Sequence, residues 1–234
     1  MRHYRAILFD LDQTLLNRHQ SLLHFCQWQA CEYFKFDSAT TALFVQRFIT
    51  LDANGAVWKD QVYTQLKQEF DIPDTVDTLV DLYLRQFNLF CSPHASVRKV
   101  IQQLYVDGYL LGLISNGRSP FQQHNFYSLG LSQYFSSIIV SEAVGLRKPD
   151  SAIFFLACQQ LKQKPSQCIF VGDNELADVQ GAQSAGLTAI RFDPPTSIED
   201  LSQSRATARI NDFSQLLNVI QYLENNNLNQ TYKL

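Results

Sequence analysis

The sequence predicts a doubly wound α/β fold, in which helices cover both faces of a parallel sheet. Five short apolar runs, rich in β-branched residues, are typical of strands that are buried on both sides. These runs are residues 6–9, 110–115, 137–141, 168–172 and 188–192. Helical segments lie between most of them, and this alternation of strand and helix predicts a parallel sheet. One long helical stretch interrupts the alternation after the first strand.

Four helical segments, each preceding one of the later strands, connect the predicted sheet. They cover residues 94–106, 120–129, 151–162 and 174–185. Gly130 and Gly186 follow two of them, where a left-handed residue commonly ends a helix. Both glycines support the predicted boundaries.

The stretch between the first and second strands predicts an all-helical insert, rich in Phe, Tyr and Trp. Its amphipathic segments are residues 21–33, 39–50, 58–70 and 75–90, separated by turn residues. Aromatic residues at helical spacing are more often bundle core than ligand contacts. We therefore expect a catalytic core formed by residues 1–16 and 91–234, and a helical domain formed by residues 17–90.

Composition limits the function classes. Hydrophobic residues make up 46% of the 234 residues and charged residues 18%, which predicts a globular chain. A net charge of -3 offers no basic excess for a nucleic acid or an anionic membrane. No apolar stretch approaches the ~18 residues that span a bilayer. The apolar N-terminal stretch is interrupted by acidic residues and is too short for a secretion signal.

The five cysteines show no Cys-x-x-Cys pair and lie at positions 26, 31, 91, 158 and 168. They occur in apolar stretches, where a thiol packs as a small hydrophobic group. We expect reduced core residues rather than a redox or zinc site. These features together favour a cytoplasmic protein.

Two carboxylates directly follow the first predicted strand, in the pattern Asp-x-Asp-x-Thr at residues 10–14. In an open parallel sheet, groups just past the carboxyl ends of strands face the ligand-binding crevice. Asp10 and Asp12 repel each other unless a cation lies between them, and a hard divalent cation meets that need. The pattern arises by chance in about one chain of this length in twenty, and either Asp could simply cap a turn.

The second and third strands are also followed by groups that a phosphate site needs. Ser115, Asn116 and the next loop amides offer hydrogen-bond donors to phosphate oxygens, although Ser-Asn-Gly alone indicates only a turn. Lys148 stands beside a proline before a helix start, where it can offer a positive charge to a phosphoryl group. A solvated surface lysine is the alternative.

The fourth strand is followed by two further acids. Asp173 comes directly after the strand, and Asp178 about one helical turn later, so both can point back to the same crevice. Helix capping is the alternative for either residue.

These four motifs, each at the end of a different strand and in this order, resemble the haloacid dehalogenase superfamily. The resemblance covers residues 1–16 and 91–200 and implies a Rossmann-like core. It also identifies the insert as a helical cap, in which residues 51–60 are similar to bacterial small phosphatases and nucleotidases. One departure is Gln13, where the family usually has Gly or Asp.

The resemblance implies a Mg²⁺-dependent phosphohydrolase that acts on a small phosphorylated metabolite. By this comparison Asp10 is the nucleophile and Asp12 is the general acid and base. Asp173 is a magnesium ligand, alongside Asp10 and the main-chain carbonyl of Asp12.

The remaining motif residues receive supporting roles by the same resemblance. Ser115 and Lys148 hold the phosphate, with Asn116 beside them in the loop. Asp178 orients the metal ligands or binds the metal through water.

Three other functions stay open at this point. A 2-haloacid dehalogenase shares the fold and the nucleophile, but it has no use for Asp12 or for the acidic pair Asp173 and Asp178. A phosphomutase differs only in the acceptor of the phosphoryl group. A non-catalytic binding module usually lacks one of the charged motif residues. The motifs do not identify the substrate or the oligomeric state. Candidate substrate contacts in the cap are Asn54, Lys59 and Arg47.

Overall fold

A computed structural model describes residues 2–194 and 204–231 of the chain. Its contacts divide the chain into two compact units. Met1–Leu16 and Pro93–Leu234 form the first, here called the sheet unit, and Asn17–Ser92 form the second, here called the helical unit.

In the described residues, the sheet unit contains six parallel strands in the order β3-β2-β1-β4-β5-β6. The strands are β1 (Ala6–Phe9), β2 (Leu110–Ser115), β3 (Phe135–Val140), β4 (Cys168–Gly172), β5 (Thr188–Phe192) and β6 (Ala208–Ile210). The winding reverses between β1 and β4, where an open α/β sheet binds its ligands. The predicted parallel, doubly wound fold is confirmed. The short β6 was not predicted, because its three residues carry no strand pattern of their own.

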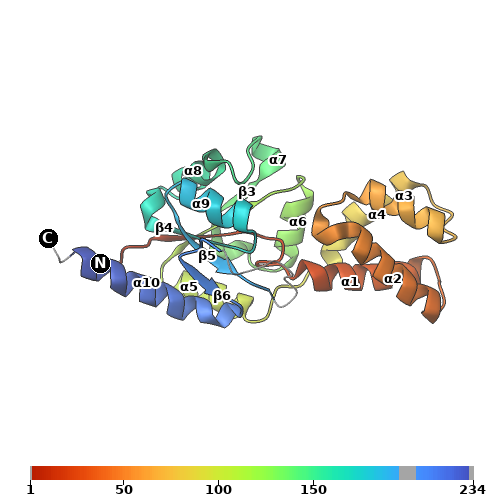
Figure 1. The fold of residues 1–234 in the computed structure, drawn as a ribbon, viewed down its shortest axis with the longest axis horizontal. Coiled ribbons are helices and arrows are strands. Elements are labelled where there is room, and N and C mark those ends of the chain that lie inside the picture. The colour runs from red at the N-terminus through yellow and green to blue at the C-terminus, as the bar shows by residue number, and fades with distance from the viewer. Residues whose placement is uncertain (1, 195–203, 232–234) are drawn as a thin grey trace. The chain divides into compact units, whose positions relative to one another are not determined.

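Helices cover both faces of this sheet. They are α5 (Val97–Val106), α6 (Phe121–Ser128), α7 (Ser141–Val144), α8 (Ser151–Gln160), α9 (Gly181–Ser184) and α10 (Leu216–Thr231). Helices α8 and α9 cover one face, and α5 and α10 cover the other (Figure 1). Neighbouring residues of β1 point to opposite faces: Leu8 packs in the core beneath α8 and α9, whereas the ring of Phe9 lies 6.1 Å from that of Phe213.

The segment predicted as one helix over residues 174–185 has two parts. It begins as a π-helical turn, Glu175–Gln180, and continues as α9. The side chain of Asn174 accepts a hydrogen bond from the amide of Ala177 at 2.7 Å, and Asp178 Oδ2 accepts one from the Asn174 amide at 3.0 Å. The wider turn thereby directs the Asp178 carboxylate back toward the end of β4. Single π turns of this kind are frequent at functional sites.

The helical unit consists of four main helices, as the sequence indicated. They are α1 (Arg18–Trp28), α2 (Ser38–Asp52), α3 (Lys59–Glu69) and α4 (Val76–Gln86). The Phe25 ring lies at the centre of its core, 5.3 Å from Tyr83 and 6.1 Å from Phe87 in edge-to-face contacts. Aromatic pairs of this geometry contribute about 0.5–1.5 kcal/mol each beyond burial. The aromatic residues of the insert thus form a bundle core.

A buried ion cluster links α1, α2 and α3. Asp52 accepts two hydrogen bonds from the Arg18 guanidinium, at 2.7 and 2.9 Å, and one from the Lys59 ammonium. Burial alone would raise the pKa of Asp52, but the two cations hold it below its usual value. Lys59 is therefore engaged inside the helical unit, and Arg47 forms a surface ion pair with Glu69 at 2.7 Å. Neither ion pair supports the expected role of Lys59 or Arg47 as a substrate contact.

The cysteines differ partly from the prediction. All five are free, and Cys26, Cys158 and Cys168 are buried. Cys31 is exposed and Cys91 is half-buried, so the expectation that all are core residues was wrong for these two. Cys31 lies in the π-helical segment Gln29–Tyr33 that follows α1, and Cys91 directly follows the 3-10 helix Phe87–Phe90. Among the described residues, no helix has the length and apolarity to cross a membrane.

Candidate active site

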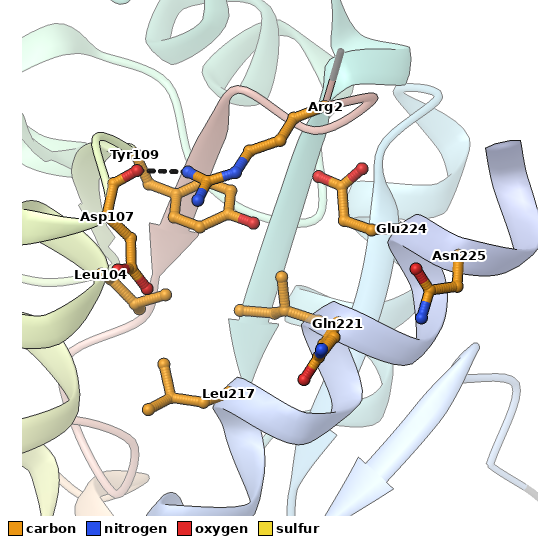
Figure 2. Close-up of a pocket in the computed structure, with 9 residues that line it drawn as sticks. Arg2, Leu104, Asp107, Tyr109, Leu217, Gln221, Glu224 and Asn225 are labelled. Atoms are coloured by element: carbon orange, nitrogen blue, oxygen red, sulfur yellow. Dashed lines mark hydrogen bonds between the residues drawn. The ribbon is translucent and has the colours of Figure 1, made fainter.

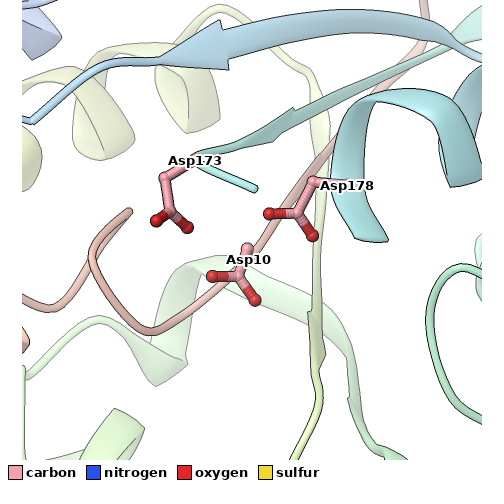
Figure 3. A group of neighbouring side chains, drawn as sticks. All are labelled: Asp10, Asp173 and Asp178. Carbon is pink, nitrogen blue, oxygen red and sulfur yellow. The ribbon is translucent and has the colours of Figure 1, made fainter. Parts of the chain in front are cut away.

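Three carboxylates meet at the carboxyl ends of β1 and β4, where the winding of the sheet reverses. Asp10 follows β1, Asp173 follows β4, and Asp178 comes from the π turn. Each offers a carboxylate oxygen, and these oxygens lie within 4.8 Å of one another. Figure 3 shows the three side chains gathered close together. A backbone hydrogen bond of 2.9 Å from the Asp10 amide to the Val171 carbonyl fixes the two strand ends side by side.

Lys148 binds this acidic cluster directly. Its ammonium lies 2.5 Å from Asp10 Oδ1 and 2.7 Å from Asp178 Oδ1, and its side chain is only 2% exposed. The alternative of a solvated surface lysine is thus excluded. Burial would lower the pKa of Lys148, but the adjacent carboxylates outweigh burial and raise it above its usual value. Lys148 therefore carries a permanent positive charge beside Asp10.

The carboxylates of the cluster resist being ionised together unless a further cation is present. Burial, together with the charge of Asp178, raises the pKa of Asp10 from 3.8 to about 7 despite the nearby ammonium of Lys148. Burial and the charges of Asp10 and Asp178 likewise raise the pKa of Asp173. If all three carboxylates are ionised, they carry two more negative charges than the Lys148 ammonium balances, and their oxygen donors suit a hard divalent cation. The residues present fit a Mg²⁺ ion.

Gly172 makes the close approach of Asp178 possible. A Cβ atom on Gly172 would lie 2.4 Å from Asp178 Oδ2, which is closer than any real contact. The residue before Asp173 therefore needs to be glycine for the Asp178 carboxylate to reach the cluster. Sequence reasoning did not assign this role, although Gly-Asp after a strand was the available signal.

Ser115 and Asn116 differ in what they offer. Ser115 ends β2, is buried, and its hydroxyl has no hydrogen-bond partner among the described residues. A buried donor without a partner is rare and suits a ligand oxygen. The Asn116 side chain instead bonds the backbone of Lys148, donating to its carbonyl and accepting from its amide, both at 2.9 Å. Asn116 thus joins the loops that carry Ser115 and Lys148.

The Asp12 side chain lies outside the acidic cluster formed by Asp10, Asp173 and Asp178. Its carboxylate accepts a hydrogen bond from Gln122 Nε2 at 2.6 Å. In the described part of the chain, only Asp10, Asp173 and Asp178 form a group that could bind a metal through side chains. Gln13 has a φ of 60°, a left-handed conformation that glycine adopts without strain.

A buried arginine stabilises the segment between Asp173 and Asp178. Arg191 of β5 is 2% exposed and contacts Glu175 at 2.9 Å and Asp193 at 2.8 Å. Glu175 lies between Asp173 and Asp178 in the chain and also accepts a hydrogen bond from the Ser204 hydroxyl at 2.7 Å. Sequence reasoning missed this support, because nothing in the sequence pairs residues this far apart.

A pocket of about 570 Å³ lies in another part of the sheet unit (Figure 2). Arg2 precedes β1 and Tyr109 precedes β2, so the pocket is at the amino ends of the strands. The Arg2 guanidinium stacks on the Tyr109 ring at 4.7 Å, and Glu224 of α10 accepts from the Tyr4 amide at 3.0 Å. Ligands of open α/β sheets bind at the opposite, carboxyl edge. The acidic cluster, not this pocket, is therefore the candidate active site.

Comparisons with known proteins agree with the fold and the site. A family model described as haloacid dehalogenase-like hydrolase matches residues 7–192. The structure also resembles that of the HAD-hydrolase YfnB from Bacillus subtilis bound to magnesium, with a TM-score of 0.75 and 23% identity. That likeness covers 93% of this chain and 98% of the other, and it shows a common fold.

Two similar curated proteins are phosphatases. The glyceraldehyde 3-phosphate phosphatase of Pyrococcus furiosus is 27% identical over 230 residues, covering 94% of this chain and 95% of that protein. The ribulose-1,5-bisphosphate 5-phosphatase of Halopiger xanaduensis is 28% identical over 203 residues, covering 81% and 84%. Because the family model spans most of the chain, the chain belongs to the haloacid dehalogenase-like hydrolases, and it is a phosphatase within that superfamily.

Proposed function

We propose that this protein is a magnesium-dependent phosphatase that cleaves a small phosphate monoester through a phosphorylated Asp10. The observation that carries the proposal is the position of Asp10. It lies at the end of the central strand β1, in an acidic cluster with Asp173 and Asp178, and in contact with the ammonium of Lys148. A nucleophile, a cation site and a fixed positive charge thus meet at one point.

In the first step, an Asp10 carboxylate oxygen attacks the phosphorus atom, and the bond from phosphorus to the alcohol oxygen breaks. Asp12 in its acid form transfers its proton to that oxygen, so the product leaves as a neutral alcohol. Lys148 and the Ser115 hydroxyl stabilise the charge on the phosphoryl oxygens during the transfer. The products are the alcohol and the phosphorylated Asp10.

In the second step, Asp12 acts as a base. It takes a proton from a water molecule as the water oxygen attacks phosphorus, and the bond from phosphorus to Asp10 breaks. Inorganic phosphate leaves and both aspartates return to their starting forms.

The proposed metal ligands are the carboxylates of Asp10 and Asp173 and the main-chain carbonyl of Asp12, with Asp178 in support. When bound, Mg²⁺ would neutralise charge on the transferred phosphoryl group. The charge excess of the cluster and the magnesium in the similar Bacillus subtilis structure support this choice of metal.

Mg²⁺ should stabilise the protein more at high pH than at low pH. The pKa of Asp10 is about 7 in the metal-free protein against 3.8 ordinarily, and that of Asp173 is also raised. The folded protein therefore retains protons that the unfolded chain releases, so stability from these groups is present below pH about 4 and is lost as the pH rises through about 7. Thermal unfolding with and without Mg²⁺ should show a small Tm increase at about pH 5 and a larger one at about pH 8.

The Asp173→Asn variant tests whether the Mg²⁺ effect on Tm arises from a metal at the acidic cluster. It removes one carboxylate of the cluster, so the pH-dependent effect of Mg²⁺ on Tm should shrink. An equal Mg²⁺ effect in the wild type and this variant would argue against a metal at the cluster.

The substrate class is proposed from the relatives and the helical unit. The two curated relatives act on phosphorylated sugars of small size, by their names. We propose that residues 17–92 serve as a cap that selects the organic part of such a substrate. A screen of phosphorylated sugars, nucleoside monophosphates and phosphoglycolate with Mg²⁺ tests this proposal. One preferred small phosphate ester is the expected outcome, and lack of turnover of every ester and of p-nitrophenyl phosphate would contradict it.

A further inference from the structure

Gln122 makes a contact that the proposed mechanism has not used. It is the second residue of α6, only 4% exposed, and its Nε2 donates to Asp12 Oδ2 at 2.6 Å. Its Oε1 accepts a hydrogen bond from Nδ2 of the fully buried Asn125 at 3.1 Å. The amide of Gln122 is therefore held at both ends, with its donor directed at Asp12.

The loop after β2 has the shape that this contact requires. A Cβ atom on Gly117 would lie 2.7 Å from Gln122 Cγ and 2.9 Å from its Nε2. The side chain of Gln122 thus crosses the space that any other residue at position 117 would fill. A buried side chain that passes over a glycine to bond one carboxylate is fixed by its surroundings and has little rotational freedom.

We propose that Gln122 is a positioning residue for proton transfer, which keeps Asp12 Oδ2 an acceptor so that the transferred proton is carried on Oδ1. The inference rests on the proposed function of Asp12. An amide N–H only donates, so a proton on Oδ2 would face another hydrogen, whereas a proton on Oδ1 keeps the Gln122 bond intact. In the first step this proton passes from Oδ1 to the leaving alcohol oxygen as the phosphorus–oxygen bond breaks.

The test compares substrates that differ in their need for a proton. An alkyl phosphate releases a strongly basic alkoxide unless it is protonated, whereas p-nitrophenyl phosphate releases a stable phenolate. The value of kcat/KM reports steps up to formation of the phosphorylated enzyme, and so isolates the first proton transfer. Gln122→Met keeps the side-chain length and removes the donor. It should lower kcat/KM for the alkyl ester by roughly 10- to 100-fold, part of the 10²–10⁴-fold typical of a general acid, and that for the nitrophenyl ester much less.

Gln123→Met is the matched control. Gln123 lies next to Gln122 on α6, and its side chain bonds the Ser119 hydroxyl at 2.9 Å rather than Asp12. This variant should leave the ratio of the two kcat/KM values unchanged. In an Asp12→Asn background, Gln122→Met should add little further loss, because the proton that it positions is already absent.

Two outcomes would overturn the inference. One is an equal loss of kcat/KM for both esters in Gln122→Met, which would indicate a structural role only, and the other is no loss at all. If Gln122→Met does not fold, Asn125→Ser removes the hydrogen bond that holds Gln122 and should show a weaker form of the same selectivity. Failure of the proposed function is distinguishable, because it would appear as wild-type protein without Asp10-dependent turnover.

Discussion

Replacing Asp10 by Asn should abolish phosphatase turnover, with a loss of about 10⁴-fold or more in kcat. An amide oxygen is a poor nucleophile, and the variant also loses one carboxylate of the proposed metal site. The fold should persist, because Lys148 keeps its contact with Asp178 and the number of crowded negative charges falls. Steady-state kinetics with p-nitrophenyl phosphate and Mg²⁺ measure the loss, and circular dichroism checks the fold.

Asp107→Asn is a suitable control for this substitution. Asp107 is an exposed residue of the sheet unit that follows α5, and its carboxylate accepts a bond from the Gln103 side chain at 2.9 Å. The same chemical change there should leave kcat unaltered. Wild-type turnover by the Asp10→Asn variant would refute the assignment of Asp10 as the nucleophile.

Removal of divalent metal should have the second largest effect. Chelation by EDTA should lower phosphatase activity by at least about 10²-fold, because several kcal/mol of charge stabilisation at the phosphoryl oxygens would be lost. Added Mg²⁺ should restore it. The clustered carboxylates of Asp10, Asp173 and Asp178 give the physical reason, since a cation among them allows Asp10 to be ionised beside the other two acids.

The same treatment distinguishes the dehalogenase alternative. Hydrolysis of 2-halo acids through an aspartate nucleophile needs no metal, so such an activity would persist in EDTA. Phosphatase activity that survives full chelation, checked by metal analysis of the protein, would contradict a magnesium site.

Most of the sheet could be predicted from the sequence because its strands are buried on both faces. Such strands read as continuous apolar runs, and the predicted bounds of β1, β2, β4 and β5 agree with the structure. The strand β6 and the helix α10 were missed. The three residues of β6 pair only with β5 at the edge of the sheet, and so short an edge strand has no apolar run to reveal it.

The candidate site could be predicted only as far as the strand ends. Because parallel strands present their carboxyl ends at one edge, residues that directly follow them, such as Asp10 and Asp173, were expected together. The contacts of Gln122 with Asp12 and of Arg191 with Glu175 join residues 110 and 16 positions apart in the chain. Such pairs depend on how α6 and β5 pack, which local sequence patterns do not encode.

The central claim, that Asp10 captures the phosphoryl group, can be tested most directly by trapping the intermediate. Sodium borohydride reduces an acyl phosphate to a primary alcohol, so protein quenched with it during turnover should carry that change at residue 10. Peptide mass spectrometry locates the modified residue, and Asp10→Asn protein provides the blank. The account predicts reduction at Asp10 that requires both substrate and Mg²⁺. Active turnover with an unmodified Asp10, or with the modification on another carboxylate, would contradict it.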